Sequence, residues 1–82
     1  MLQWTDVDSS NVSRVSFHED TKTICVQFAN GGLYAYSGAD NAMFVSLVHA
    51  ESVGKYLNSV VKAECPYAKF NDEAELLSSL AA

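Results

Sequence analysis

Apolar and polar residues alternate along three short stretches in the first half of the chain, at residues 12–17, 24–28 and 33–37. A period of two residues is typical of β-strands. The segments between these stretches are short and polar. One of them, Asn30-Gly31-Gly32, is rich in residues that accept a positive φ at little cost, as tight hairpins require. Short connections join antiparallel strands, so the pattern predicts a small antiparallel sheet of about three strands.

The third predicted strand carries Tyr34 and Tyr36 on one face and Leu33 and Ala35 on the other. Two tyrosines on one strand face can form a platform on which bases stack, or they can anchor a protein partner. They can equally belong to the core, with their hydroxyl groups hydrogen-bonded. The register of the sheet decides between these alternatives, and the pattern alone does not specify it.

A helical period replaces the alternation after residue 40. The spacing predicts a helix near residues 41–50, capped by Asp40, and a second helix capped by Ser52. Apolar residues of the second helix recur at i, i+3, i+4, i+7 and i+8, which is an amphipathic pattern. These residues are Val53, Tyr56, Leu57, Val60 and Val61. Pro66 is expected to end this helical unit.

A last short helix is predicted over residues 72–81, with Asn71 as its cap and Asp72 and Glu73 at the positive end of its dipole. Its expected apolar side consists of Ala74, Leu77, Leu80 and Ala81. This helix either docks on the domain or mediates self-association. The whole chain, residues 1–82, is thus predicted to be one α+β domain: a small antiparallel sheet packed by two helices, plus a short C-terminal helix.

Composition narrows the range of functions. Ten acidic residues against five basic ones leave a net charge of −5, which disfavours non-specific binding to nucleic acid. No apolar run approaches the roughly 20 residues of a membrane span, and the N-terminus does not resemble a secretory signal. We therefore expect a cytoplasmic protein that does not associate with membranes. In that compartment Cys25 and Cys65 are expected to be free thiols.

Residues with catalytic or metal-binding chemistry are few. His18 and His49 lie on different predicted elements, and a nucleophile pair of Cys65 with His49 is conceivable but has no local sequence signature. Structural zinc sites use paired Cys or His ligands at short spacing, and the chain has no such pair. The sequence therefore predicts no catalytic residue, no metal site and no cofactor.

Several short blocks together carry a family resemblance. They are Ser9-Ser10-Asn11-Val12, Val26-x-Phe28, Asn30-Gly31-Gly32, Tyr34-x-Tyr36-Ser37-Gly38, Ala50-x-Ser52-x-Gly54-Lys55-Tyr56-Leu57-Asn58 and Pro66-Tyr67. On these blocks, residues 9–70 resemble the KTSC domain, a small module named for its occurrence at the C-terminus of some lysyl-tRNA synthetases. The module also occurs alone in bacterial and phage proteins. Residues 71–82 lie outside the resemblance, as a C-terminal helical extension.

The resemblance implies a domain type more than an activity, because the function of the family is not established. Its attachment to a synthetase suggests RNA binding. This chain departs from the family pattern at Ser59 and Glu64, where members often carry basic residues, and at Cys65, where an aromatic residue is usual. These departures remove charge and a stacking ring from the expected nucleic-acid face, so they weaken the RNA hypothesis.

The candidate binding surface combines the tyrosine strand with the second helix. Its predicted residues are Tyr34, Tyr36, Ser52, Gly54, Lys55, Asn58 and Lys62. A structural explanation stays open for some of them. Ser52 can cap the helix, Gly54 can let the sheet approach, and Asn58 can bond to a loop backbone.

We expect a non-catalytic binding module whose ligand is a protein partner. One alternative is a phage-encoded acidic inhibitor of a host nucleic-acid-binding or defence system, which presents carboxylates where phosphates would sit. A second alternative is an RNA-binding module, disfavoured by the net charge, in which Lys55, Lys62 and Lys69 hold the phosphates.

Overall fold

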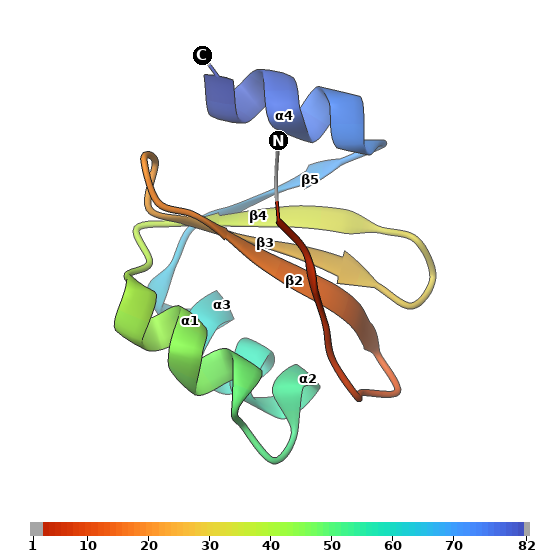
Figure 1. The fold of residues 1–82 in the computed structure, drawn as a ribbon, viewed down its shortest axis with the longest axis vertical. Helices are drawn as coiled ribbons and strands as arrows, with labels where there is room; N and C mark the ends of the chain where they lie inside the picture. Colours follow the sequence, from red (N-terminus) through yellow and green to blue (C-terminus); the bar gives the residue numbers. More distant parts are fainter. Residues whose placement is uncertain (1–2, 82) are drawn as a thin grey trace.

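The chain folds around an antiparallel sheet of five strands, described for residues 3–81 in a computed structural model (Figure 1). The strands are β1 (Thr5–Asp6), β2 (Val12–His18), β3 (Thr23–Phe28), β4 (Leu33–Ser37) and β5 (Tyr67–Phe70), and they lie side by side in chain order. The predicted α+β class and antiparallel sheet are confirmed, but the expectation of about three strands is wrong. Two-residue β1 and four-residue β5 are too short to display a clear alternation.

The hairpin between β3 and β4 sets the register of the tyrosine strand. Gly31 has a φ of 92°, and the side-chain oxygen of Asn30 accepts a hydrogen bond from the Gly32 N–H at 2.9 Å. This turn places Tyr34 opposite Val26 and Tyr36 opposite Ile24. The two tyrosines therefore share a face with the apolar residues of β3.

Both predicted helix caps after the sheet are confirmed. The Asp40 carboxylate accepts a hydrogen bond from the Met43 N–H at 2.8 Å and starts α1 (Asn41–Val48). The Ser52 hydroxyl accepts a hydrogen bond from the Lys55 N–H at 3.3 Å. The second helical unit consists of α2 (Val53–Tyr56), the π-helical turn η1 (Leu57–Val61) and α3 (Lys62–Glu64), and it ends before Pro66 as expected.

The π-helical turn explains how the second unit covers the sheet. From α2 to the residue after α3, the buried apolar side chains are spaced by four: Val53, Leu57, Val61 and Cys65. In a regular α-helix such a spacing would rotate each successive side chain by about 40° around the axis. The wider turn of η1 absorbs this rotation and keeps the stripe on the sheet.

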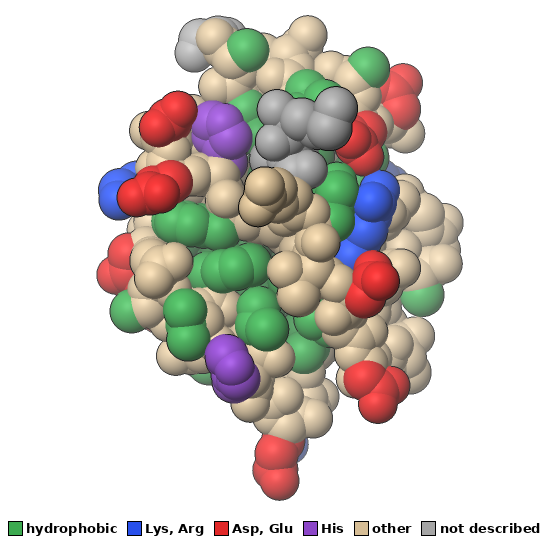
Figure 2. Space-filling model, in the orientation of Figure 1, with side chains coloured by type: hydrophobic (Ala, Val, Ile, Leu, Met, Phe, Trp, Pro, Cys, Tyr) green, Lys and Arg blue, Asp and Glu red, His purple; other side chains and the backbone are tan. Residues whose placement is uncertain are grey.

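The sheet is covered on both faces. Figure 1 shows α1, α2 and α3 on one side and α4 (Glu73–Ala81) on the other. Under α1–α3 the buried core consists of Val12, Val15, Ile24, Val26, Tyr36, Ala39, Leu47, Val53, Leu57, Val61 and Cys65. A smaller buried cluster under α4 consists of Cys25, Ala35, Leu76 and Leu80. We call these two sides the tyrosine face and the α4 face. Figure 2 shows further hydrophobic side chains gathered around α1 on the outside of the molecule.

The C-terminal helix differs in detail from its prediction. Asp72, rather than Asn71, caps it, because the Asp72 carboxylate accepts a hydrogen bond from the Glu75 N–H at 2.8 Å. Leu76 and Leu80 are its buried residues, whereas Ala74 is exposed. The predicted apolar side is therefore correct at Leu80 and at the partly buried Leu77, wrong at the exposed Ala74 and Ala81, and it missed Leu76. Since the helix buries its leucines on the sheet, the docking alternative is the observed one, and self-association through α4 stays a prediction.

Arg14 joins the N-terminal segment to the C-terminal helix across the α4 face. Its guanidinium lies 4.3 Å from the centre of the Trp4 ring and forms an ion pair with Glu73 at 3.1 Å. It also donates a hydrogen bond to the side-chain oxygen of Gln27. The side chain thus ties the segment around Trp4, the first three strands and α4 together.

Candidate functional site

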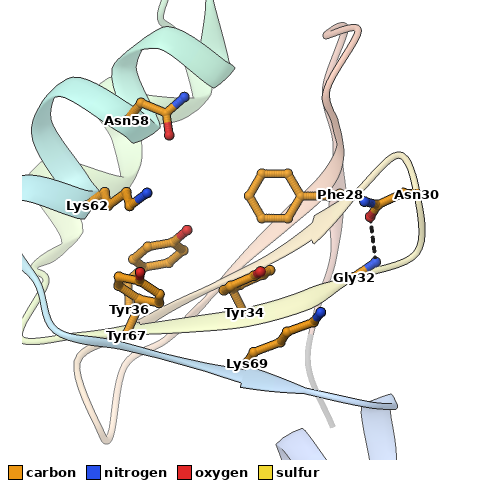
Figure 3. A pocket seen from close by; sticks show the side chains of 9 residues that line it. All are labelled: Phe28, Asn30, Gly32, Tyr34, Tyr36, Asn58, Lys62, Tyr67 and Lys69. Atoms are coloured by element: carbon orange, nitrogen blue, oxygen red, sulfur yellow. Dashed lines mark hydrogen bonds between the residues drawn. The ribbon is translucent and has the colours of Figure 1, made fainter.

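A groove of about 250 Å³ runs between the end of the sheet and the second helical unit (Figure 3). β3, β4 and β5 form its floor, and η1 with the start of α3 forms its wall. The lining residues are Phe28, Asn30, Gly32, Tyr34, Tyr36, Asn58, Lys62, Tyr67 and Lys69. We call this the tyrosine groove.

Aromatic rings make up the floor of the groove. Tyr36 and Tyr67 are paired across β4 and β5 with ring centres 5.6 Å apart, and Tyr34 lies 6.4 Å from Tyr36 and 5.9 Å from Tyr67. Phe28 meets the Tyr34 ring edge-on at 5.2 Å. Such contacts hold the rings in place, so the groove is preformed before any ligand arrives.

The three tyrosines differ sharply in exposure. Tyr36 is 3% exposed and belongs to the core, Tyr34 is half-buried, and Tyr67 is 50% exposed. Burial, helped by the neighbouring Tyr34 and Tyr67, raises the pKa of Tyr36 to about 12. The alternative that the tyrosines are core therefore holds for Tyr36, while Tyr34 and above all Tyr67 present their rings to the groove.

Two lysines give the groove a positive potential within an acidic chain. The Lys62 ammonium lies 5.7 Å from the centre of the Tyr67 ring, within cation–π range. Lys69 follows two residues after Tyr67 on β5 and is paired with Tyr34. No aspartate or glutamate lines the groove. The positive charge of this site is thus available to an anionic ligand group.

The π-helical turn also sets the polar wall. Asn58 and Lys62 each follow a residue of the buried stripe, so the same spacing of four that aligns the stripe aligns both side chains along the groove. Figure 3 shows the Asn58 amide facing the groove, without a hydrogen bond to any other lining residue. Its amide can therefore donate to and accept from a ligand.

The structure brings together some of the predicted site residues and separates others. Tyr34, Tyr36, Asn58 and Lys62 line the tyrosine groove. Gly54 lines an adjoining hollow that shares Phe28, Asn30 and Asn58 with the groove. Ser52 and Lys55 lie instead at a shallow surface beside Tyr56 and Ser59 and do not line the tyrosine groove, so their role in binding stays a prediction.

The predicted close approach at Gly54 is present but loose. A methyl group there would come no nearer than 3.6 Å to Asn11, which is ordinary van der Waals contact. Gly54 is therefore not required by crowding.

Five lining residues of the tyrosine groove were not among the predicted site residues, and Lys69 had been named only for the RNA alternative: Phe28, Asn30, Gly32, Tyr67 and Lys69. A signal for two of them existed. Tyr67 and Lys69 alternate with Ala68 and Phe70, which is the period of a strand, and both carry chemistry that matches the tyrosine strand. The segment was too short for this alternation to stand out.

The two thiols are buried and protonated at neutral pH. Burial raises the pKa of Cys25 to about 12, and burial, with smaller contributions from Glu64 and Asp40, raises the pKa of Cys65. The Cys65 sulfur contacts the Met43 sulfur, whereas the His49 ring is hydrogen-bonded to the Val45 carbonyl. The conceivable Cys65–His49 pair is thus not assembled.

Residues 3–81 contain no cluster of three or more His, Cys, Asp or Glu side chains with the geometry of a metal site. In the same part of the chain, no helix is long and apolar enough to cross a membrane.

Comparison with known proteins places the fold. The chain superposes on the crystal structure of the KTSC domain protein YPO2434 from Yersinia pestis with a TM-score of 0.80 and 24% identity, over 87% of this chain and 100% of that one. Among curated proteins, none matches the chain. The family model of the KTSC domain matches residues 8–65. Because this match spans more than half of the sequence, the chain belongs to the KTSC domain family.

Proposed function

We propose that this domain is a non-catalytic binding module that recognises a protein partner through the tyrosine groove. One observation carries the proposal: the half-exposed ring of Tyr67 lies in a groove that also presents Lys62 and Lys69, among rings that are already packed. Tyrosine is enriched at binding hot spots because it contributes a large apolar area together with a polar tip. A preformed aromatic site also lowers the entropy lost on binding.

The exposure of the rings favours a protein over RNA. A single-strand binder stacks successive bases on successive exposed rings. Here Tyr36 is buried and Tyr34 is half-buried beneath the helical wall, so Tyr67 alone presents a large exposed area. The chain also carries a net charge of −5, which repels a phosphate backbone outside the immediate groove. A short protein segment needs no row of exposed rings, and one that carries a single carboxylate is repelled less by the net charge than a phosphate backbone with a charge at every nucleotide.

Affinity capture from a lysate of the source cells, treated with nuclease, tests the proposal. The bait is the full chain, compared with the groove variants Lys62→Glu and Tyr67→Ala and with Lys22→Glu as a control. Lys22 lies in the turn between β2 and β3, outside the groove, and its replacement makes the same change of charge. We expect the same protein to be captured by the wild type and by Lys22→Glu and to be lost in both groove variants.

Two outcomes would contradict the proposal. If capture depends on intact RNA and falls steeply as salt rises, the RNA-binding alternative replaces it. If a protein is captured equally by all four baits and is lost only when acidic surface residues are neutralised, the acidic-inhibitor alternative replaces it. Retention of the partner by both groove variants would in either case exclude the tyrosine groove as the binding site.

A further inference from the structure

The outer edge of β5 is open for hydrogen bonding. β5 is the last strand of the sheet, and no strand within residues 3–81 pairs with its far side. The Ser37 N–H donates a hydrogen bond to the Pro66 carbonyl at 2.9 Å, which makes Ser37 and Pro66 a hydrogen-bonded pair. Such pairs alternate along an antiparallel ladder. Ala68 and Phe70 therefore bond inward to β4, whereas the N–H and C=O groups of Tyr67 and Lys69 point outward.

The same two residues supply side chains to the tyrosine groove. Tyr67 and Lys69 both line it, and Lys62 reaches over the Tyr67 ring from α3. The backbone groups available for pairing and the side chains available for recognition thus belong to the same pair of residues. A strand placed beside β5 would direct alternate side chains onto this face, next to Tyr67 and Lys69.

We infer that the partner binds by adding an extended acidic segment as a sixth strand along β5. This inference rests on the proposed function and specifies its binding mode. The segment carries an apolar side chain beside Tyr67 and, two residues away, a carboxylate between Lys69 and Lys62. Backbone hydrogen bonds to Tyr67 and Lys69 supply affinity that is independent of sequence, and the alternate side chains supply selectivity.

Charge identifies the occupant as an acidic segment rather than a second copy of β5. Lysine on an edge strand discourages pairing with an identical edge, because the two cations would lie close together. Here Lys69 and Lys62 make that repulsion stronger, since no carboxylate lines the groove to offset them. The same two cations attract a carboxylate, so the edge is selective in charge.

A random-peptide display selection against the immobilised full chain tests the pattern. Enriched peptides are expected to carry Asp or Glu two positions from an apolar residue, with no proline between them. Addition of the selected peptide should slow hydrogen exchange at the Tyr67 and Lys69 amides. The Ala68 and Phe70 amides, already bonded to β4, serve as internal controls. Enrichment of no common pattern, or protection confined to other residues, overturns the inference.

Substitutions at Lys69 distinguish the contribution of its backbone to binding from that of its side chain. Lys69→Ala removes the charge, whereas Lys69→Pro also removes an outward N–H that the β4 ladder does not use. We expect Lys69→Pro to bind the selected peptide about tenfold more weakly than Lys69→Ala. Methylation of the peptide nitrogen that faces the Lys69 carbonyl gives the same test without altering the protein. Equal affinity in both comparisons excludes strand addition.

The failure of this inference differs from failure of the proposed function. If partner capture still depends on Lys62 and Tyr67 while Lys69→Pro behaves like Lys69→Ala, the groove binds the partner by side chains alone. If capture is also indifferent to Lys62 and Tyr67, the proposed function itself is wrong.

Discussion

The two faces of the sheet differ in how helices cover them. On the tyrosine face, two helical units bury a large aliphatic core and still leave a groove where rings, amides and ammonium groups meet the solvent. On the α4 face, one short helix closes a small cluster, and Arg14 ties that helix to Trp4. Packing dominates the second face, whereas the first combines packing with the tyrosine groove.

The family match covers only part of the molecule and leaves out its last strand and helix. It covers residues 8–65, which include all of α1–α3 and the strands β2, β3 and β4. β5 and α4 follow it. The groove is therefore composite: Tyr34, Asn58 and Lys62 come from the matched part, and Tyr67 and Lys69 come from the segment after it. The most exposed chemistry of the site lies on this last strand, and we expect partner selectivity to reside there.

Truncation of the paired tyrosines Tyr36 and Tyr67 should separate stability from binding on the tyrosine face. Tyr36→Ala removes a ring that is 3% exposed, so we expect a loss of about 3–5 kcal/mol in the free energy of unfolding. Tyr67→Ala removes a ring that is 50% exposed and should cost about 1 kcal/mol or less, while partner capture is lost. Urea unfolding followed by circular dichroism measures both. Equal destabilisation by the two variants would mean that Tyr67 belongs to the core rather than to the site.

The α4 face should respond to mutation in stability alone. Leu76 is 0% exposed at the centre of its cluster, so Leu76→Ala should lower the free energy of unfolding by about 2–4 kcal/mol. Leu77→Ala, at a half-buried position on the same helix, is the matched control and should cost about half as much or less. Both variants should still capture the partner at temperatures where they remain folded. Loss of capture by folded Leu76→Ala would show that the two faces are coupled.

The contrast between the faces also explains what could be predicted from the sequence. Strong local patterns in the sequence led to correct predictions of structure. These were the alternation of β2–β4, the Asp40 and Ser52 caps and the end of the helix before Pro66, which all reflect interactions within a few residues. Features that depend on distant partners were missed. The pattern did not show that Cys25 and Ala35 are buried, because the helix that covers them begins about 40 to 50 residues later in the chain.

For the candidate site too, local features were predicted and features that depend on distant residues were not. Tyr34, Tyr36, Asn58 and Lys62 were predicted together and lie together, because a strand and the next helical unit supply them. Ser52 and Lys55 were included because they belong to the same motif block as Asn58, and the helix directs them to another surface. Tyr67 was missed and Lys69 was named only for the RNA alternative, since only pairing with β4 brings them to the groove.

Alkaline pH should distinguish the two faces through their titrating groups. Of the three predictions, we expect this one to give the smallest change in the free energy of unfolding. Burial raises the pKa of Cys25, on the α4 face, from 9.0 to about 12, and that of Tyr36, on the tyrosine face, from 10.0 to about 12. In each case the folded state keeps a proton that the unfolded state loses. The stabilisation is therefore complete below the pKa that the group has in the unfolded state. It falls as the pH rises toward the pKa that the group has in the folded state. Each such group lowers the free energy of unfolding by about 1.4 kcal/mol per pH unit in that window.

Cys25→Ala should flatten this decline from about pH 9 upward, and Tyr36→Phe only from about pH 10 upward. Urea midpoints measured at intervals between about pH 8 and pH 11 give both slopes. If Cys25→Ala leaves the decline above about pH 9 unchanged, Cys25 loses its proton equally in the folded and unfolded states and is not sealed from solvent as its burial indicates.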